Sequence, residues 1–154
     1  IYPENNPAGL QTLHDLANED LLLVLAAPEV PVGQYSLDFL EKARNDPEFG
    51  PEYSDAVLAN LVSSEQNVRA VLTKVALGEA DAGIVYVSDL IASEGEQVGQ
   101  LEIPDALNTI ATYPIAALND SALPQQAQAF VDFVLSAAGQ EVLARYGFIP
   151  AVSP

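Results

Sequence analysis

The sequence contains no cysteine and only one histidine, His14. The absence of cysteine excludes disulfide bridges, thiolate catalysis and cysteine-ligated metal sites. A single histidine excludes any metal centre that needs several imidazole ligands. His14 lies beside Asp15 in a segment that we expect to be helical. Because no nucleophile motif lies near it, a solvated helix histidine is a simpler interpretation than a catalytic base.

Basic residues are also scarce. Five lysines and arginines stand against 22 aspartates and glutamates, which gives a formal net charge of -17. No basic patch can be assembled from so few residues, which argues against nucleic acid as a partner and disfavours anionic membrane surfaces. The acids are spread along the chain and are not massed in a tail, a pattern typical of a solvated surface.

Long apolar runs are absent too, since none reaches the roughly 18–20 residues that a membrane-spanning helix needs. The longest run, at residues 21–28, has the length of a buried strand. With 154 residues, 49% of them hydrophobic, the chain can bury a core as one domain or as two small lobes. It begins IYPENNP, which resembles a loop and not a signal peptide, so we expect a processed form or a piece of a longer protein.

Apolar periodicity predicts that strands and helices alternate in the first part of the chain. Strands are predicted at residues 21–28 and 82–87, and helices near 10–17 and over 34–44, 53–61 and 68–75. Ser63 and Gln66 have the spacing of a capping box before the last of these helices, and Gly78 is expected to end it. Strand, helix and strand recur with short connections, which predicts an α/β fold with a mainly parallel sheet flanked by helices.

The remainder of the chain has a different pattern. Further strands are predicted at residues 97–104 and 109–118, after an extended entry segment at 1–7. After Leu123 two helices are predicted. The apolar face of the first of them contains Ala127, Phe130, Val131, Val134 and Leu135.

Two of the predicted helix starts suit an anion. The turn PVGQY at residues 31–35 and the helix start at Asn67 and Val68 each present unpaired backbone N–H groups. Such ends carry about half a positive charge, bind anions without lysine or arginine, and cluster at the carboxyl edge of an open α/β sheet. The hydroxyl of Tyr86 is expected at the same edge. The alternative is ordinary helix starts and a core tyrosine, because every α/β protein has such ends.

Carboxylate pairs are numerous in so acidic a chain. The pair that an enzyme could use is Asp81 with Asp89, which flank the end of the strand predicted at residues 82–87. An enzyme of this kind needs a raised carboxylate pKa and a closed cleft. The abundance of acids makes each pair weakly informative, and none fits a calcium-binding loop.

Four segments occur in the order VPVGQY, NVR, GEADAGIVY and RYGF. With them the chain resembles, over nearly its whole length, the periplasmic molybdate-binding proteins, the solute receptors of molybdate and tungstate ABC importers. The resemblance implies two α/β lobes that close on a tetrahedral oxyanion, held by neutral donors with no metal ligand and no cofactor. It implies backbone N–H donors at Val32 and Val68 and a hydroxyl donor at Tyr86. The family usually has alanine at the position of Val32, a change that a backbone donor tolerates.

The same resemblance divides the chain into parts of two lobes. Residues 1–7 would be an inter-lobe crossing strand, 8–109 a complete second lobe, 110–118 a return crossing strand, and 119–154 the terminal helices of an incomplete first lobe. The N-terminal portion of the family, which by resemblance supplies two further hydroxyl donors, is absent here, so we expect weak binding by this chain alone. The terminal helices should expose their apolar face or bury it against another copy, which predicts self-association.

The expected function is that of a non-enzymatic receptor. It would capture molybdate or tungstate outside the cytoplasmic membrane, either in the periplasm or anchored by a segment outside this sequence, and deliver it to an ABC permease. Selectivity over sulfate would follow from cavity size, since a misfit leaves buried donors unpaired at a cost of ~1–3 kcal/mol each. The alternatives are a receptor for another oxyanion, the effector domain of a regulator, an enzyme that uses Asp81 and Asp89, and a lobe that binds nothing.

Overall fold

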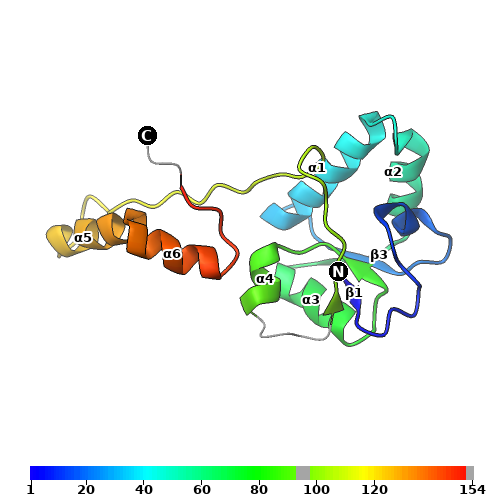
Figure 1. Ribbon diagram of the computed structural model, residues 1–154, viewed down its shortest axis with the longest axis horizontal. Coiled ribbons are helices and arrows are strands. Elements are labelled where there is room, and N and C mark those ends of the chain that lie inside the picture. The colour runs from blue at the N-terminus through cyan, green and yellow to red at the C-terminus, as the bar shows by residue number, and fades with distance from the viewer. Residues whose placement is uncertain (93–97, 152–154) are drawn as a thin grey trace. The chain divides into compact units, whose positions relative to one another are not determined.

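The computed structural model describes residues 1–92 and 98–151, and the chain divides into two compact units, Ile1–Thr109 and Ile110–Pro154 (Figure 1). In chain order, the first unit contains β1 (Tyr2–Pro3), the 3-10 helix η1 (Leu13–Ala17), β2 (Leu23–Ala26), α1 (Pro31–Asn45), α2 (Gly50–Ala59), β3 (Leu61–Glu65), α3 (Val68–Ala76), β4 (Ala82–Gly83), α4 (Val87–Ala92) and β5 (Val98–Gly99). The second unit contains α5 (Pro124–Leu135) and α6 (Ala137–Arg145).

Strand β2 is the centre of a three-stranded parallel sheet with the order β3-β2-β4. Leu23 lies opposite Leu61 of β3 and Ala82 of β4. The antiparallel pair of β1 with β5 forms a separate two-stranded sheet, which hydrogen bonds of Ile1 connect to β4. The Ile1 nitrogen donates to the Gly83 carbonyl oxygen at 2.8 Å, and the Gly83 N–H donates back to Ile1 at 3.1 Å. The parallel sheet with its flanking helices confirms the predicted α/β class.

The side chains of β2 enter two separate cores. Leu23 and Leu25 belong to a first core, which also contains Leu16 of η1, Phe39 of α1 and Val57 of α2. Val24 and Ala26 belong to a second core, which also contains Val32 of α1 and Val71 and Val75 of α3. Figure 1 shows α1 and α2 together on one side of the strands and α3 on the other. Since successive side chains of a strand point to opposite faces, β2 is covered on both faces as predicted, but it spans Leu23–Ala26 and not the whole predicted run at 21–28.

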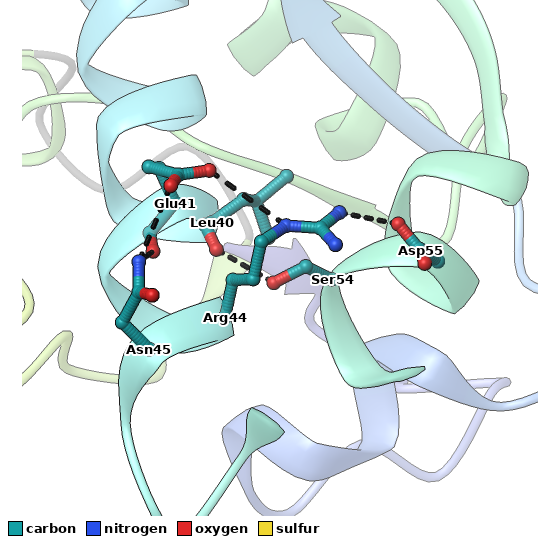
Figure 2. A network of polar contacts seen from close by, with 6 residues as sticks. All are labelled: Leu40, Glu41, Arg44, Asn45, Ser54 and Asp55. Atoms are coloured by element: carbon teal, nitrogen blue, oxygen red, sulfur yellow. Dashed lines mark hydrogen bonds and ion pairs between the residues drawn. The ribbon is translucent and has the colours of Figure 1, made fainter. Parts of the chain in front are cut away.

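Polar contacts join α1 to α2 (Figure 2). The Ser54 hydroxyl is buried and donates to the Leu40 carbonyl oxygen at 2.6 Å, so this buried polar group is satisfied. The Arg44 guanidinium pairs with Asp55 on α2, and its Nε lies 3.7 Å from Glu41 on its own helix. The Arg44 guanidinium therefore helps to hold α1 against α2.

The second unit begins with backbone that forms neither helix nor strand and then contains the two predicted helices, which are confirmed. Ser136 ends α5 and caps α6, because its Oγ accepts the Gly139 N–H at 3.2 Å. The rings of Tyr113 and Phe148 pack edge to face with their centroids 5.6 Å apart. Most of the large apolar side chains of α5 are exposed: Phe130 by 62%, Phe133 by 55% and Leu135 by 52%.

Several predicted bounds in the first unit are wrong. Helix α1 begins at Pro31 and not at Gln34, because proline at the first helical position has a suitable φ and needs no N–H partner. The predicted capping box is absent, since Ser63 lies in β3, a strand that was missed because alternate side chains of it are exposed. Asn67 caps α3 instead, and Gly78, with φ of 72°, follows the end of that helix as predicted.

Other predicted strands are shorter than expected. The strand predicted at residues 82–87 is confined to Ala82–Gly83, and Val87 already starts α4. The strand predicted at 97–104 is reduced to Val98–Gly99, with position 97 outside the described residues. Residues 109–118 form no strand in the described structure, since no neighbouring strand pairs with them. The helix predicted at 10–17 is the shorter 3-10 helix η1, and that predicted at 53–61 starts earlier, at Gly50.

The close approach of α1 to the end of β2 requires glycine at position 33. A Cβ there would lie 2.1 Å from the Ala27 carbonyl oxygen and 2.5 Å from that of Ala26, and backbone atoms cannot rotate away. Alanine favours a helix over glycine by up to ~1 kcal/mol. We nevertheless expect Gly33→Ala to lower the free energy of unfolding by about 1–3 kcal/mol, because the clash outweighs this gain.

Urea denaturation measures this difference. Gln34→Ala, at the exposed neighbouring position, is the control and should change the free energy of unfolding by no more than about 0.5 kcal/mol. Unchanged or increased stability of Gly33→Ala would contradict the tight packing of α1 on β2.

Candidate functional site

Three helices of the first unit begin after the carboxyl ends of the parallel strands. Strand β2 leads into α1, β3 into α3, and β4 into α4. Because these strands are parallel, their carboxyl ends share one edge of the sheet. The Ala27 N–H donates to the Glu65 carbonyl oxygen at 2.8 Å and so holds the ends of β2 and β3 together. The predicted donor residues Val32, Val68 and Tyr86 all follow these strand ends.

Val32 is the second residue of α1, and its N–H has no hydrogen-bond partner in the described part of the chain. The N-cap residue, Val30, provides no side-chain cap, and its carbonyl oxygen accepts the N–H groups of Gly33 and Gln34. The Val32 side chain is 2% exposed, and its carbonyl oxygen accepts the Ser36 hydroxyl at 2.7 Å. Packing therefore holds an unpaired backbone donor in a fixed place.

Val68 is the first residue of α3. The side chain of Asn67 accepts the Ala70 N–H at 2.9 Å and so satisfies one of the unpaired donors of this helix end. No partner for the Val68 N–H occurs among the described residues. The start of α3 therefore offers a second unpaired backbone donor.

An ion pair fixes the connection that carries Val68. Glu65, the last residue of β3, accepts the Lys74 ammonium of α3 at 2.6 Å and the Ser63 hydroxyl at 2.5 Å. These hydrogen bonds, that of Lys74 first, lower the pKa of the Glu65 carboxyl below its ordinary value. Lys74 also donates to the Ser63 hydroxyl at 3.2 Å. Strand β3 and helix α3 are thus tied together on either side of the turn that precedes Val68.

Tyr86 immediately precedes α4. Its N–H donates to Asp89 Oδ2 at 3.0 Å, and its carbonyl oxygen accepts the Asp89 N–H at 3.0 Å. Its ring is partly buried and packs edge to face on Tyr35 of α1, with the ring centroids 6.3 Å apart. The Tyr86 side chain is therefore held between α1 and the start of α4.

The structure brings the three predicted donor residues to one apolar cluster. Val32 belongs to the second core, and Val68 and Tyr86 pack against it. The first turns of α1 and α3 contain no acidic residue. Two unpaired N–H dipoles and a tyrosine beside an apolar cluster form an arrangement that suits a small anion.

The carboxylates of Asp81 and Asp89 have separate local partners. Asp81 Oδ2 accepts the Leu22 N–H at 2.9 Å beside the start of β2, whereas Asp89 lies beyond the carboxyl end of β4 and caps α4 at Tyr86. Burial raises the pKa of Asp89, and the Tyr86 N–H and the Arg69 charge offset this rise only in part. Both carboxylates therefore have structural partners, and nothing in these contacts joins them as a catalytic pair.

A family model of bacterial extracellular solute-binding proteins matches residues 1–149. The chain belongs to this family. It is 34% identical over 148 residues to the molybdate-binding protein ModA of Mycobacterium tuberculosis, an alignment that covers 96% of this chain and 52% of that protein. ModA of Escherichia coli is 31% identical over 130 residues, which cover 82% of this chain and 45% of that protein. The chain thus spans about half the length of these curated relatives.

Solved structures share the fold of this family member. A protein described as the substrate-binding domain of a molybdenum ABC transporter from Clostridium difficile superposes with a TM-score of 0.74 at 23% identity, over 98% of this chain and 62% of that one. Peb3 from Campylobacter jejuni superposes with a TM-score of 0.68 at 17% identity, over 96% and 62% of the two chains. Membership of a solute-binding family agrees with the prediction of a binding protein and not with that of an Asp81 and Asp89 enzyme.

The described residues offer neither a metal-binding cluster nor a membrane-spanning helix. The described residues contain no group of three or more histidine, cysteine, aspartate or glutamate side chains that could hold a metal ion. Within the same residues no helix combines the length and hydropathy needed to cross a membrane. His14 is exposed, as predicted for a helix histidine, and its ring stacks on Phe49 with the centroids 4.4 Å apart.

Two residues that organise the site were missed in the sequence. Asn67 was recognised as part of a helix start but not as the cap, although an asparagine directly before an apolar helix is a common cap signal. Asp89 was considered only as a possible catalytic acid. Its spacing of three residues from Tyr86 is that of a carboxylate that reaches back to the N–H before a helix.

The raised pKa of Asp89 predicts the pH dependence of stability. A carboxyl whose pKa is higher in the folded than in the unfolded state binds its proton more tightly when folded. Ionisation of Asp89 therefore costs stability, and this cost appears as the pH rises through and above the ordinary aspartate value of 3.8. We expect Asp89→Asn, whose amide oxygen can still accept the Tyr86 N–H, to lose less stability than the parent between about pH 4 and 7.

Urea-unfolding midpoints across this pH range check the expectation. If the parent and Asp89→Asn lost stability equally as the pH rises, burial would not disfavour the ionised form of the Asp89 carboxyl, and the expectation would be wrong.

Proposed function

We propose that this chain provides donors for a tetrahedral oxyanion, molybdate or tungstate, in an extracytoplasmic receptor that delivers the ion to an ABC permease. The observation that carries the proposal is the pair of unpaired N–H groups, of Val32 and Val68, at one edge of the sheet. Tyr86 packs against the same apolar cluster and would add a hydroxyl donor. Relatives at 31–34% identity that are named as molybdate-binding proteins support the choice of ligand.

Backbone donors explain how a chain with a net charge of -17 could hold a dianion. The dipoles of α1 and α3 act at close range on an ion at their ends. Surface carboxylates farther away are screened within roughly 8–10 Å at physiological salt. Selectivity over the smaller sulfate would depend on the distance between the donors and the oxygens of the anion. Donors fixed by packing cannot move inward to reach the oxygens of a smaller ion, and each donor left unpaired costs ~1–3 kcal/mol.

Two variants remove single proposed donors from this site. Val68→Pro deletes the N–H at the first position of α3, where proline fits, and Asn67 already has the extended backbone that precedes proline, with φ of -161° and ψ of 161°. Tyr86→Phe deletes the hydroxyl and keeps the ring. We expect each to weaken molybdate binding about 10–100-fold, since a hydrogen bond to a charged group contributes ~1.5–3 kcal/mol.

Isothermal titration with molybdate, tungstate and sulfate measures these changes. Val68→Ala, which keeps the N–H, and Tyr35→Phe, on the neighbouring ring, are matched controls that should retain most of the affinity. The parent is expected to bind molybdate and tungstate weakly but more tightly than sulfate. Equal affinity of Val68→Pro and Val68→Ala would contradict the proposed role of the backbone, and preference for sulfate or phosphate would indicate a receptor for another oxyanion.

We also propose that the chain associates with itself through the exposed apolar side chains of α5. Phe130 and Phe133 are each more than half exposed on a single helix, and large exposed apolar patches mark interaction surfaces.

Sedimentation velocity should show a concentration-dependent dimer or larger species. Phe130→Gln combined with Phe133→Gln should shift the chain to the monomer, whereas Gln125→Ala with Gln128→Ala, on exposed polar positions of α5, should not. A parent that stays monomeric at high concentration would contradict this proposal.

A further inference from the structure

Four of the five basic side chains already have polar partners. Lys42 donates to Asn108 and Thr109, Arg44 pairs with Asp55 (Figure 2), Lys74 pairs with Glu65, and Arg145 pairs with Glu141. Arg69 is the remaining base. Its exposed side chain makes no hydrogen bond or ion pair with the residues that the structure describes. Among the residues that the structure describes, the basic side chain without such a partner is therefore Arg69, which adjoins Val68 and the candidate site.

The position of Arg69 is unfavourable for the helix that carries it. Arg69 is the second residue of α3, where the partial charge of the helix end is positive and a cation is repelled. No acidic residue occupies the first turn of α3 to offset this repulsion. A residue that destabilises its own helix, with no structural gain to offset this, is typical of positions that serve a function.

The charge of Arg69 also acts on Asp89 of α4. It is close enough to Asp89 to lower the pKa of that carboxyl, although burial is the larger effect and raises the pKa. Asp89 in turn accepts the Tyr86 N–H at 3.0 Å. Arg69 therefore acts electrostatically on the same edge of the sheet at which Val68 and Tyr86 lie, and no described residue forms an ion pair with it.

We propose that Arg69 is the electrostatic entry residue of the oxyanion site, which attracts the dianion to the carboxyl edge of the sheet while neutral donors hold it. This inference rests on the function proposed above. A single cation beside positive helix ends creates a local positive potential in an otherwise negative surface, and such potentials raise the rate at which a charged ligand arrives. The contribution is long-range, so it should be sensitive to salt, unlike the short hydrogen bonds of the donors.

Arg69→Gln tests the inference against Lys42→Gln, which removes the same charge from the same unit. Lys42 lies ten residues after Val32 on α1, or about 15 Å along the helix, beyond the screening length of about 8 Å at 0.15 M salt. At that salt concentration we expect Arg69→Gln to bind molybdate about two- to fivefold more weakly than Lys42→Gln. At about 1 M salt, where the screening length is about 3 Å, the difference should vanish.

Thermal unfolding supplies a second readout. The comparison is made in the Asp89→Asn background, which lacks the favourable interaction of Arg69 with the Asp89 carboxylate. Because Arg69 opposes the dipole of α3, adding Arg69→Gln to Asp89→Asn should leave the melting temperature equal or raise it, whereas a structural role would lower it. Equal molybdate affinities of Arg69→Gln and Lys42→Gln at 0.15 M salt would overturn the inference. If Val68→Pro still weakens binding in that case, the donor site stands and only the role of Arg69 fails. If no variant binds molybdate, both proposals fail.

Discussion

The fold and the candidate site both depend on the burial of β2 on its two faces. Leu23 and Leu25 enter one core and Val24 and Ala26 enter the other, so the strand cannot shift by one residue without exchanging the two sets. The parallel neighbours β3 and β4 then share one carboxyl edge with β2. The starts of α1, α3 and α4 follow at that edge as a geometric consequence of the parallel sheet.

The site differs from a surface cluster of charges because its proposed donors belong to the backbone. The Val32 amide is fixed by a buried side chain, and the turn before Val68 is held by the ion pair of Glu65 with Lys74. Preorganised dipoles of this kind need no rearrangement when an anion arrives. The acidic composition is therefore compatible with anion binding, and near the start of α3 the Glu65 carboxylate is already paired with Lys74.

The sequence allowed the α/β class, the doubly buried β2 and the two terminal helices to be predicted, because each depends on a long apolar pattern. It did not allow β3 to be found, since LVSSE is an edge strand with alternate exposed positions and little apolar content. The strand predicted at residues 109–118 failed for the opposite reason. Its sequence is apolar, but a strand also requires a neighbouring strand with which to exchange hydrogen bonds. The apolar pattern of a segment does not show whether such a neighbour exists.

The candidate site was predictable in part. The turn that contains Val32 and the helix start at Val68 could be identified from the pattern, and the resemblance assigned donor roles to Val32, Val68 and Tyr86. Their common contact with the second core depends on tertiary packing that no local pattern contains. The cap of α4 by Asp89 was also missed, because in a chain with 22 acidic residues the spacing of one carboxylate from Tyr86 carries little information by itself.

A molybdate titration followed by amide chemical shifts in a 1H–15N correlation spectrum tests the central claim most directly, because it reports on the backbone donors themselves even when binding is weak. We predict that the Val32 and Val68 amide signals shift most and reach saturation with molybdate, and that sodium chloride at equal ionic strength leaves them in place. Shifts that depend only on ionic strength, or that saturate elsewhere in the chain, would contradict it.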